Sequence, residues 1–324
     1  MTQKSNTRNI ACVFPGQGSQ YIGMGKSLIE SYPEIQPAFE KAKEELGYDY
    51  LDISLNGPEE LLNDTAYTQV CIYILSVAIF SILENQGFVP RIVAGHSLGE
   101  YSALTAAHVI SFEDGLNIVS KRAKLMSAAA KKKPGKMLAV LGADMRTIDD
   151  IVAQLSKKGI VSVANYNCPG QIVLSAESSL AEQAEKVLKS VGVKRVVSLP
   201  VSGAFHSKIM AGAEKEFMSF LNGYIFLTAG VPVVPNTLAQ PVVDAPEIRK
   251  ALESQMSSSV KWQQSIQQII GLGINSFIEV GPGQVLSRLI KRIDKDVEVL
   301  STDTTETLSK TLSFLEKTQS KLIS

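Results

Sequence analysis

Cysteine and histidine are both scarce in this sequence of 324 residues, with three of each. Cys12, Cys71 and Cys168 are an odd number of widely spaced residues without a C-x-x-C pair. Such a set predicts neither a disulfide framework nor a zinc site, so we expect no bound metal and a reducing compartment. The three histidines are few enough that each can be considered separately as a proton acceptor.

Net charge is absent as well, because 32 lysine and arginine residues balance 32 aspartate and glutamate residues. A chain of zero net charge produces no bulk field that would attract nucleic acid or an anionic membrane surface. We therefore expect neither as a partner, and any charged ligand must be held by a local group.

No segment is expected to cross a membrane. Residues 1–9 are polar and lack the apolar core of a signal peptide. The longest apolar stretch, residues 70–83, has 14 residues and includes two serines. A membrane-spanning helix needs roughly 20 residues. The stretch therefore predicts a buried core helix, and we expect the protein in the cytoplasm.

Apolar and polar segments alternate along the chain in a way that is typical of an α/β protein. Strands are predicted at residues 10–14 and 92–94, and helices at 25–46, 67–86 and 98–110. Strands that alternate with helices indicate a mostly parallel sheet flanked by helices.

Residues 134–200 break this alternation. They read as strand, helix, strand, strand, helix and strand, which is the β-α-β-β-α-β order of a ferredoxin-like unit. We therefore expect a small ferredoxin-like domain at 134–200, inserted into a discontinuous large α/β catalytic domain at 1–133 and 201–324.

A Gly-x-Ser-x-Gly pentapeptide, Gly95–Gly99, lies between the apolar run at 92–94 and the predicted helix that follows. In this setting a sharp turn lifts the serine hydroxyl out of the sheet, and the glycines let neighbouring backbone pass closely. The helix N-terminus behind Ser97 offers N–H groups to an oxyanion. Ser97 is therefore the predicted nucleophile.

A serine nucleophile needs a base within hydrogen-bond reach, and histidine has a suitable pKa. His96 adjoins Ser97, and adjacent side chains on such a turn diverge. His108 follows on the same predicted helix, about 16 Å away at the normal helical rise. His206 remains as the predicted base, although no acidic residue stands out as its partner. Orientation of the imidazole by a backbone carbonyl would remove the need for one.

Further segments form a set in a fixed order along the chain. They are Phe14–Gln20 (FPGQGSQ), Gly95–Ser102 (GHSLGEYS), Lys121–Met126 (KRAKLM), Asn165–Gln171 (NYNCPGQ), His206, Gln255 ahead of Val260–Trp262, and Glu279–Gly283 (EVGPG). In these residues the sequence resembles the malonyl-CoA:acyl carrier protein transacylases over nearly its whole length. So many motifs in the same order make the resemblance highly specific.

The resemblance assigns roles to single residues. It implies that Ser97 is acylated, that His206 is the base, and that the backbone carbonyl of Gln255 orients the imidazole. It also implies an oxyanion hole made by the backbone N–H groups of Gln17 and Leu98. A glycine-rich loop suits this role because its backbone can approach a reacting carbonyl closely.

The resemblance further implies that Arg122 binds the substrate's free carboxylate. A buried guanidinium can hold a malonyl carboxylate with two parallel hydrogen bonds. His96 is expected to line the acyl pocket. Phe205 resembles the residue of malonyl-preferring polyketide acyltransferases, with plain packing as the alternative. Asn165 is expected at the cleft between the domains, with a turn-forming role as the alternative.

The implied enzyme is an S-malonyltransferase with a ping-pong mechanism. It would move malonyl from malonyl-CoA, through a malonyl-serine, to the phosphopantetheine thiol of acyl carrier protein, and so supply fatty acid chain elongation. The CoA thioester is then a substrate, and we expect no permanently bound cofactor. The enzyme is expected to be a monomer that binds an acidic carrier protein transiently. Two alternatives remain: a Ser-His thioesterase or hydrolase on the same elbow, and a non-catalytic relative that binds carrier protein.

Overall fold

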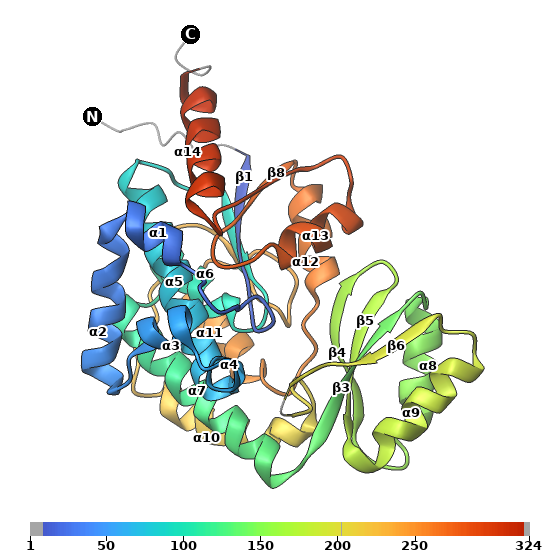
Figure 1. Ribbon diagram of the computed structural model, residues 1–324. Coiled ribbons are helices and arrows are strands. Elements are labelled where there is room, and N and C mark those ends of the chain that lie inside the picture. Colours follow the sequence, from blue (N-terminus) through green and yellow to red (C-terminus); the bar gives the residue numbers. More distant parts are fainter. Residues whose placement is uncertain (1–8, 202, 321–324) are drawn as a thin grey trace.

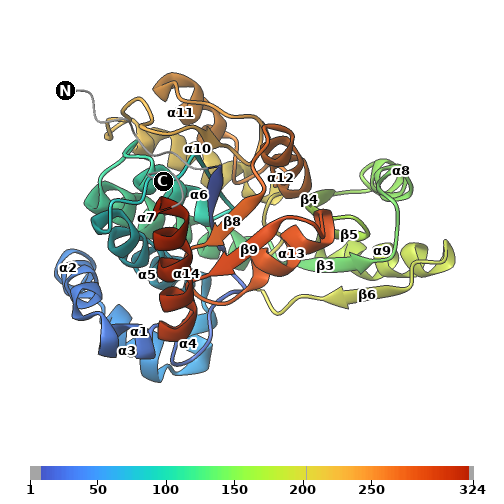
Figure 2. The same ribbon diagram turned by 90° about the horizontal axis from the view of Figure 1, so that it is seen from above.

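The computed structural model describes residues 9–201 and 203–320, so most of the polar N-terminal segment lies outside the described residues. A large α/β domain and a smaller α/β domain beside it are visible in Figure 1. The second view, in Figure 2, shows the small domain attached to one side of the large one. This architecture confirms the predicted fold class.

A five-stranded parallel sheet forms the centre of the large domain. Its strands, in spatial order, are β7 (Val233–Val234), β2 (Ile92–Gly95), β1 (Ile10–Phe14), β8 (Ser276–Glu279) and β9 (Glu298–Ser301). All five residues of β1 are buried. Continuous burial is what a parallel strand covered by helices on both faces requires.

Helices cover both faces of this sheet (Figure 1). The helices of the large domain are α1 (Lys26–Ser31), α2 (Gln36–Leu46), α3 (Tyr50–Asn56), α4 (Glu59–Asn63), α5 (Thr65–Asn85), α6 (Gly99–Ala106), α7 (Phe112–Lys132), α10 (Ala211–Leu221), α11 (Ala245–Glu253), α12 (Trp262–Gly271), α13 (Val285–Ile293) and α14 (Thr305–Ser320), with short 3-10 helices η1 (Pro33–Ile35) and η2 (Lys208–Met210).

Side chains of β1 alternate between two hydrophobic cores. Cys12 and Phe14 join the core that contains α5 and α7, whereas Ala11 and Val13 join the core formed with α12 and α13. The alternation follows from the pleat of a strand, where successive side chains point to opposite faces.

Two of the predicted helices differ from the observed ones. The single helix predicted at 25–46 is divided into α1, η1 and α2, because Pro33 cannot continue a helix from the preceding turn. The helix predicted at 98–110 ends at Ala106, and His108 has a positive φ of 57° that no α-helix accommodates.

Helix α5 is longer than its apolar stretch suggested. It has 21 residues and, among the described residues, is the one helix long and apolar enough to cross a membrane by length and composition. Of its most apolar window, 83% is buried inside the fold. A helix that is apolar all round is expected in the centre of a large protein, so its burial accounts for its composition.

The small domain contains the strands β3 (Gly135–Leu141), β4 (Val161–Cys168), β5 (Gln171–Glu177) and β6 (Arg195–Ser198), and the helices α8 (Met145–Leu155) and α9 (Ser178–Ser190). Its antiparallel sheet has the order β4-β5-β3-β6, which is the ferredoxin-like arrangement of a β-α-β-β-α-β unit. These elements fall inside the segment expected at 134–200.

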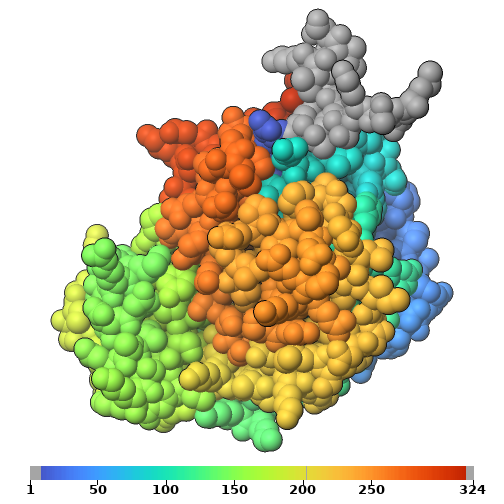
Figure 3. Space-filling view, turned by 180° about the vertical axis from the view of Figure 1, so that it is seen from behind, coloured from blue at the N-terminus to red at the C-terminus, as the bar shows by residue number. Residues whose placement is uncertain are grey.

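One face of the small sheet packs on α8 and α9, and the other faces the large domain. Met137 and Val173 belong to the hydrophobic core of the large domain, whereas their neighbours Leu138 and Leu174 belong to the small domain's own core. Val260 extends the contact by donating to the carbonyl of Ala164 over 2.8 Å. Seen from behind, the segments that follow the small domain in the sequence, coloured yellow to orange, lie on the surface beside it (Figure 3).

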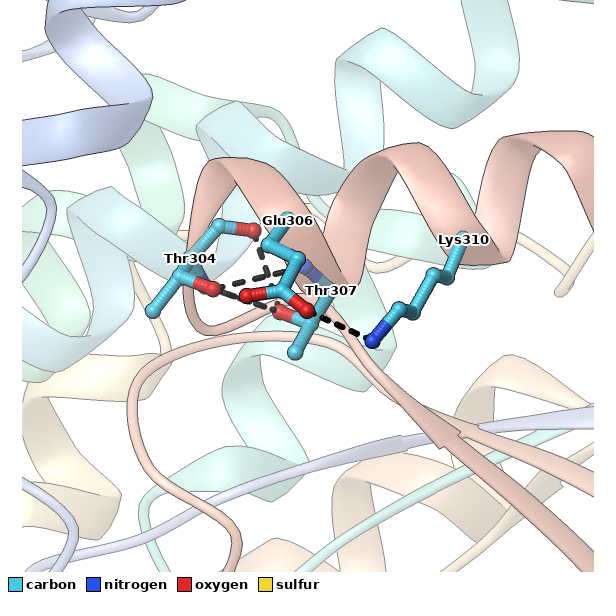
Figure 4. Close-up of polar contacts among 4 residues, drawn as sticks. All are labelled: Thr304, Glu306, Thr307 and Lys310. Carbon is cyan, nitrogen blue, oxygen red and sulfur yellow. Dashed lines mark hydrogen bonds and ion pairs between the residues drawn. The ribbon is translucent and has the colours of Figure 1, made fainter.

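The C-terminal helix α14 begins with a reciprocal pair of threonines (Figure 4). The N–H of Thr304 donates to Oγ1 of Thr307 over 2.9 Å, and the N–H of Thr307 donates to Oγ1 of Thr304 over 3.3 Å. Side chains that accept in this way satisfy N–H groups that have no partner in the first turn of a helix. Glu306 and Lys310 form an exposed ion pair of 2.6 Å one turn further on.

Candidate active site

Ser97 lies on a sharp turn between β2 and α6, and its φ of 52° is in the left-handed region. Both flanking glycines are required because a Cβ would not fit at either position. A Cβ on Gly95 would overlap the backbone of Gly99, and a Cβ on Gly99 would overlap the carbonyl of Phe14. The strand–turn–helix setting predicted for the pentapeptide is therefore present, with the serine held in a strained conformation.

Asn236, just after β7, holds the backbone of this turn. Its Oδ1 accepts a hydrogen bond of 2.7 Å from the N–H of Ser97, and its Nδ2 donates to the carbonyl of Gly95. The side chain is 1% exposed. Sequence analysis missed this residue because a single asparagine after a two-residue strand carries no motif.

His206 lies beside the serine, with its Nε2 at 2.7 Å from the Ser97 Oγ. Its Nδ1 is 3.0 Å from the carbonyl oxygens of both Gln255 and Ser258. Two acceptors at Nδ1 place the ring proton there, so Nε2 is left to accept from the serine hydroxyl. Burial, followed by the positive charge of Arg122, lowers the pKa of His206 to about 3. The imidazole is therefore neutral and available as a base.

Arg122, on α7, is fully buried and surrounded by neutral acceptors. Nη1 donates to Gln69 Oε1 over 2.6 Å, and Nε and Nη2 donate to Gln255 Oε1 over 3.2 and 2.9 Å. Nη2 also donates to Ser97 Oγ over 3.0 Å, and the guanidinium carbon lies 5.3 Å from the centre of the Tyr101 ring. Burial lowers the pKa of Arg122, yet a guanidinium stays charged in proteins.

No carboxylate forms an ion pair with Arg122 among residues 9–201 and 203–320. A buried charge is costly unless it is paired, so a guanidinium without an anionic partner is suited to bind a carboxylate. The nearest reactive atom is the Ser97 hydroxyl oxygen at 3.0 Å. A bound acyl group that ends in a carboxylate would therefore reach the guanidinium and the nucleophile together.

Ser97, Arg122 and His206 line a cavity of about 160 Å³ between the two domains. Gln17 and Leu98 line it as well, and no hydrogen bond within the described residues uses their backbone N–H groups. Donors left free beside a serine nucleophile are available to a developing oxyanion.

The small domain supplies part of the cavity wall. Asn165 lies there, as do Phe205 and His96 from the large domain. His96 Nε2 is 2.9 Å from Oδ1 of Asn167, and burial lowers the pKa of His96. All the predicted site residues except Gln255 thus line one cavity, and Gln255 lies directly behind it, bonded to both Arg122 and His206.

Sequence reasoning missed three residues of this arrangement besides Asn236. Gln69 on α5 accepts from Arg122, Ser258 supplies the second carbonyl to His206, and Glu100 on α6 accepts from the side chain of Gln255 over 2.8 Å. Gln69 and Ser258 follow no local pattern in the sequence. Glu100 could have been found from its place within the Gly95–Ser102 motif.

A serine on an elbow, a neutral histidine beside it and a buried arginine are typical of an enzyme that acts on acyl groups through a serine ester. The chain belongs to the acyl transferase domain family, whose model matches residues 11–312. It is 37% identical over 309 residues to the malonyl CoA-acyl carrier protein transacylase of Bacillus subtilis (strain 168), covering 95% of this chain and 98% of that one.

Solved structures of similar proteins have the same fold. The malonyl-CoA:acyl carrier protein transacylase of Xanthomonas oryzae pv. oryzae superposes with a TM-score of 0.91 at 38% identity, over 97% of this chain and 99% of that chain. A malonyl-transacylase in complex with its type II PKS acyl-carrier protein has a TM-score of 0.91 at 37% identity, over 94% and 99% of the chains. These likenesses confirm the family resemblance and the identification as an acyltransferase.

Proposed function

We propose that the protein transfers malonyl from malonyl-CoA to the phosphopantetheine thiol of acyl carrier protein. The observation that carries the proposal is Arg122, a buried cation without an ion-pair partner among the described residues, 3.0 Å from the Ser97 Oγ. Malonyl is an acyl group that ends in a carboxylate, so its two ends match these two groups. The malonyl-transacylase names of the relatives support the same substrate and acceptor.

In the first half-reaction, Nε2 of His206 takes the proton of the Ser97 hydroxyl across 2.7 Å as Oγ attacks the thioester carbonyl. The carbonyl oxygen becomes an oxyanion, which the N–H groups of Gln17 and Leu98 bind. The C–S bond then breaks, and the imidazolium returns the proton to the CoA sulfur. The two carbonyls at Nδ1 stabilise the transient imidazolium.

The second half-reaction reverses these steps with another thiol. His206 takes the proton of the phosphopantetheine thiol, and the thiolate attacks the malonyl ester. The C–Oγ bond breaks, and the proton moves from His206 to Ser97. No permanently bound cofactor is needed, because both thiols enter and leave as parts of substrates.

We extend the proposal to the setting of the reaction. The enzyme works as a cytoplasmic monomer, meets an acidic carrier protein transiently, and needs neither nucleic acid nor a membrane. Its malonyl-carrier product supplies fatty acid chain elongation. The roles of His96, Phe205 and Asn165 as pocket residues belong to the same proposal, supported by their places in the cavity wall.

The test is covalent labelling of the intact protein. Mixed with malonyl-CoA, the wild type should gain the mass of one malonyl group in a burst, and addition of holo-carrier should discharge it to malonyl-carrier. Ser97→Ala should gain no mass, because the nucleophile is gone. A labelled Ser97→Ala protein would overturn the assignment, and release of free malonate in the presence of carrier would make the protein a hydrolase.

A further inference from the structure

Glu100 is a buried carboxylate that the proposed reaction does not use. It lies in the first turn of α6, three residues after Ser97, is 1% exposed, and does not line the cavity. Burial raises the pKa of Glu100 to about 7. Burying a carboxyl group is costly unless it is paired or hydrogen-bonded, so the partners of Glu100 account for its place here.

The carboxylate fixes the orientation of the Gln255 side-chain amide. Nε2 of Gln255 donates to Oε2 of Glu100 over 2.8 Å and to the carbonyl oxygen of Ser97 over 2.9 Å. The other end of the amide, Oε1, therefore faces Arg122 and accepts from it twice. Oε2 of Glu100 accepts from two N–H groups and a guanidinium only donates, so the amide between them has a single orientation.

Turning that amide over would set its NH₂ group against the guanidinium. Two donors would then face each other, and Arg122 would lose the acceptor that holds its Nε and Nη2. The direction in which Arg122 presents itself to a ligand thus depends on Glu100, although no ion pair joins the two side chains.

The same oxygen atom of Glu100 also holds the elbow. Oε2 accepts from the backbone N–H of Asn236 over 3.1 Å, and the Asn236 side chain accepts from the N–H of Ser97 over 2.7 Å. One carboxylate oxygen therefore connects the group that would bind the acyl carboxylate with the backbone of the nucleophile.

We propose that Glu100 is a positioning residue for acyl selectivity: through Gln255 it holds the Arg122 guanidinium in the direction that receives the substrate carboxylate. The proposal rests on the proposed malonyl transfer. Loss of the carboxylate should lower transfer of malonyl more than transfer of acetyl, because acetyl has no charged end that depends on Arg122.

The experiment compares kcat/KM for malonyl-CoA and acetyl-CoA in Glu100→Ala, Glu100→Gln, Gln255→Met and the double variant Glu100→Ala/Gln255→Met. The control is Ser102→Ala on the same helix, whose buried hydroxyl has no hydrogen-bond partner among the described residues. Glu100→Ala should lower the malonyl-to-acetyl ratio about tenfold, because the buried amide of Gln255 loses its acceptor and its orientation is no longer fixed. Glu100→Gln, whose oxygen can still accept both bonds, should stay within about threefold of the wild type.

The double variant shows whether Glu100 acts through Gln255. Replacing Gln255 removes the amide and leaves its backbone carbonyl on His206, so adding Glu100→Ala should not lower the ratio further. Additive losses would overturn the proposal, as would equal losses for both substrates in Glu100→Ala. A fall in Glu100→Gln as large as that in Glu100→Ala would also overturn it, because the charge and not the acceptor would then be responsible.

Crystal structures of Glu100→Ala and Glu100→Gln test the positioning without any turnover. The contact between Gln255 and the Arg122 guanidinium should be lost in the first variant and kept in the second. An unchanged contact in Glu100→Ala would refute the inference even if the wild type transfers malonyl. Failure of the wild type to form malonyl-Ser97 would instead refute the proposed function, and the structures would still decide the role of Glu100.

Discussion

Arg122→Met is expected to convert a malonyl-selective enzyme into one that favours uncharged acyl groups. Methionine is a flexible apolar side chain, so it fills the volume beside Tyr101 and removes the charge. The malonyl carboxylate would then enter a buried cavity without a partner. Leaving one member of a buried ion pair alone costs about 3–5 kcal/mol, which is about 10²- to 10³·⁷-fold in kcat/KM for malonyl-CoA.

Acetyl-CoA is expected to lose far less in the same variant. Its acyl group lacks the carboxylate, so acetyl loses only what malonyl loses as well: the 3.0 Å hydrogen bond from Nη2 of Arg122 to Ser97 Oγ, and the donors to Gln69 and Gln255. A loss that both substrates share cancels in the ratio of their kcat/KM values. The acetyl-to-malonyl ratio should therefore rise at least about tenfold.

The assay measures transfer from each thioester to holo-carrier protein, with the malonyl- and acetyl-carrier products separated by chromatography. Lys124→Met provides the matched control, because Lys124 is an exposed residue of the same helix. It should leave both rates and the thermal midpoint unchanged. Equal losses of malonyl and acetyl transfer in Arg122→Met, with the fold intact, would show that Arg122 serves the serine and not the substrate carboxylate.

Two further predictions follow from the pKa of His206 and from the start of α14. Burial lowers the pKa of His206 to about 3, so the neutral imidazole contributes folding stability that is complete above pH 6.5 and is lost as the pH falls toward 3. For the same reason, the rate of Ser97 acylation should begin to fall only well below pH 6.5. Rapid-mixing measurements of the acylation rate across pH 4.5–8 check this. The variant Glu100→Gln removes the Glu100 carboxyl, whose pKa is itself about 7, so an acid limb near pH 6.5 in both the wild type and this variant would contradict the prediction. Thr304→Ala should cost about 1 kcal/mol of unfolding free energy through the lost cap. Lys310→Ala should cost clearly less, because its ion pair with Glu306 is exposed to solvent. Urea unfolding gives both values, and the reverse order would contradict the reasoning.

Much of the site could be predicted because the nucleophile has a local signature. Gly95 is required by its contact with the backbone of Gly99, and Gly99 by its close approach to the carbonyl of Phe14, so both requirements appear in the sequence as the spacing of one short motif. The base was found by elimination among three histidines. The structure agrees with the exclusions: His96 turns to Asn167, and His108 is an exposed partner of Glu84 at 2.9 Å.

The remainder could not be predicted because it depends on contacts between distant segments. Asn236 is 139 residues from the serine whose N–H it holds, and Gln69 is 53 residues from Arg122. A single amide on a helix or after a short strand reads as an ordinary polar residue. Only the folded chain shows that both amides are buried, with Gln69 directed at the Arg122 guanidinium and Asn236 at the backbone of the elbow.

The arrangement around Arg122 explains how a buried cation can stay without a direct anionic partner. A carboxylate bonded to the guanidinium would stabilise the empty site and would occupy the position that a substrate carboxylate needs. The structure instead sets Glu100 behind the amide of Gln255, and the π face of Tyr101 against the cation. Glu100 is near enough to favour the charged form of Arg122, yet the acceptors that Gln69 and Gln255 offer to the guanidinium are uncharged. We expect an incoming carboxylate to add a charge pair to these contacts, and this difference should favour malonyl over an uncharged acyl group.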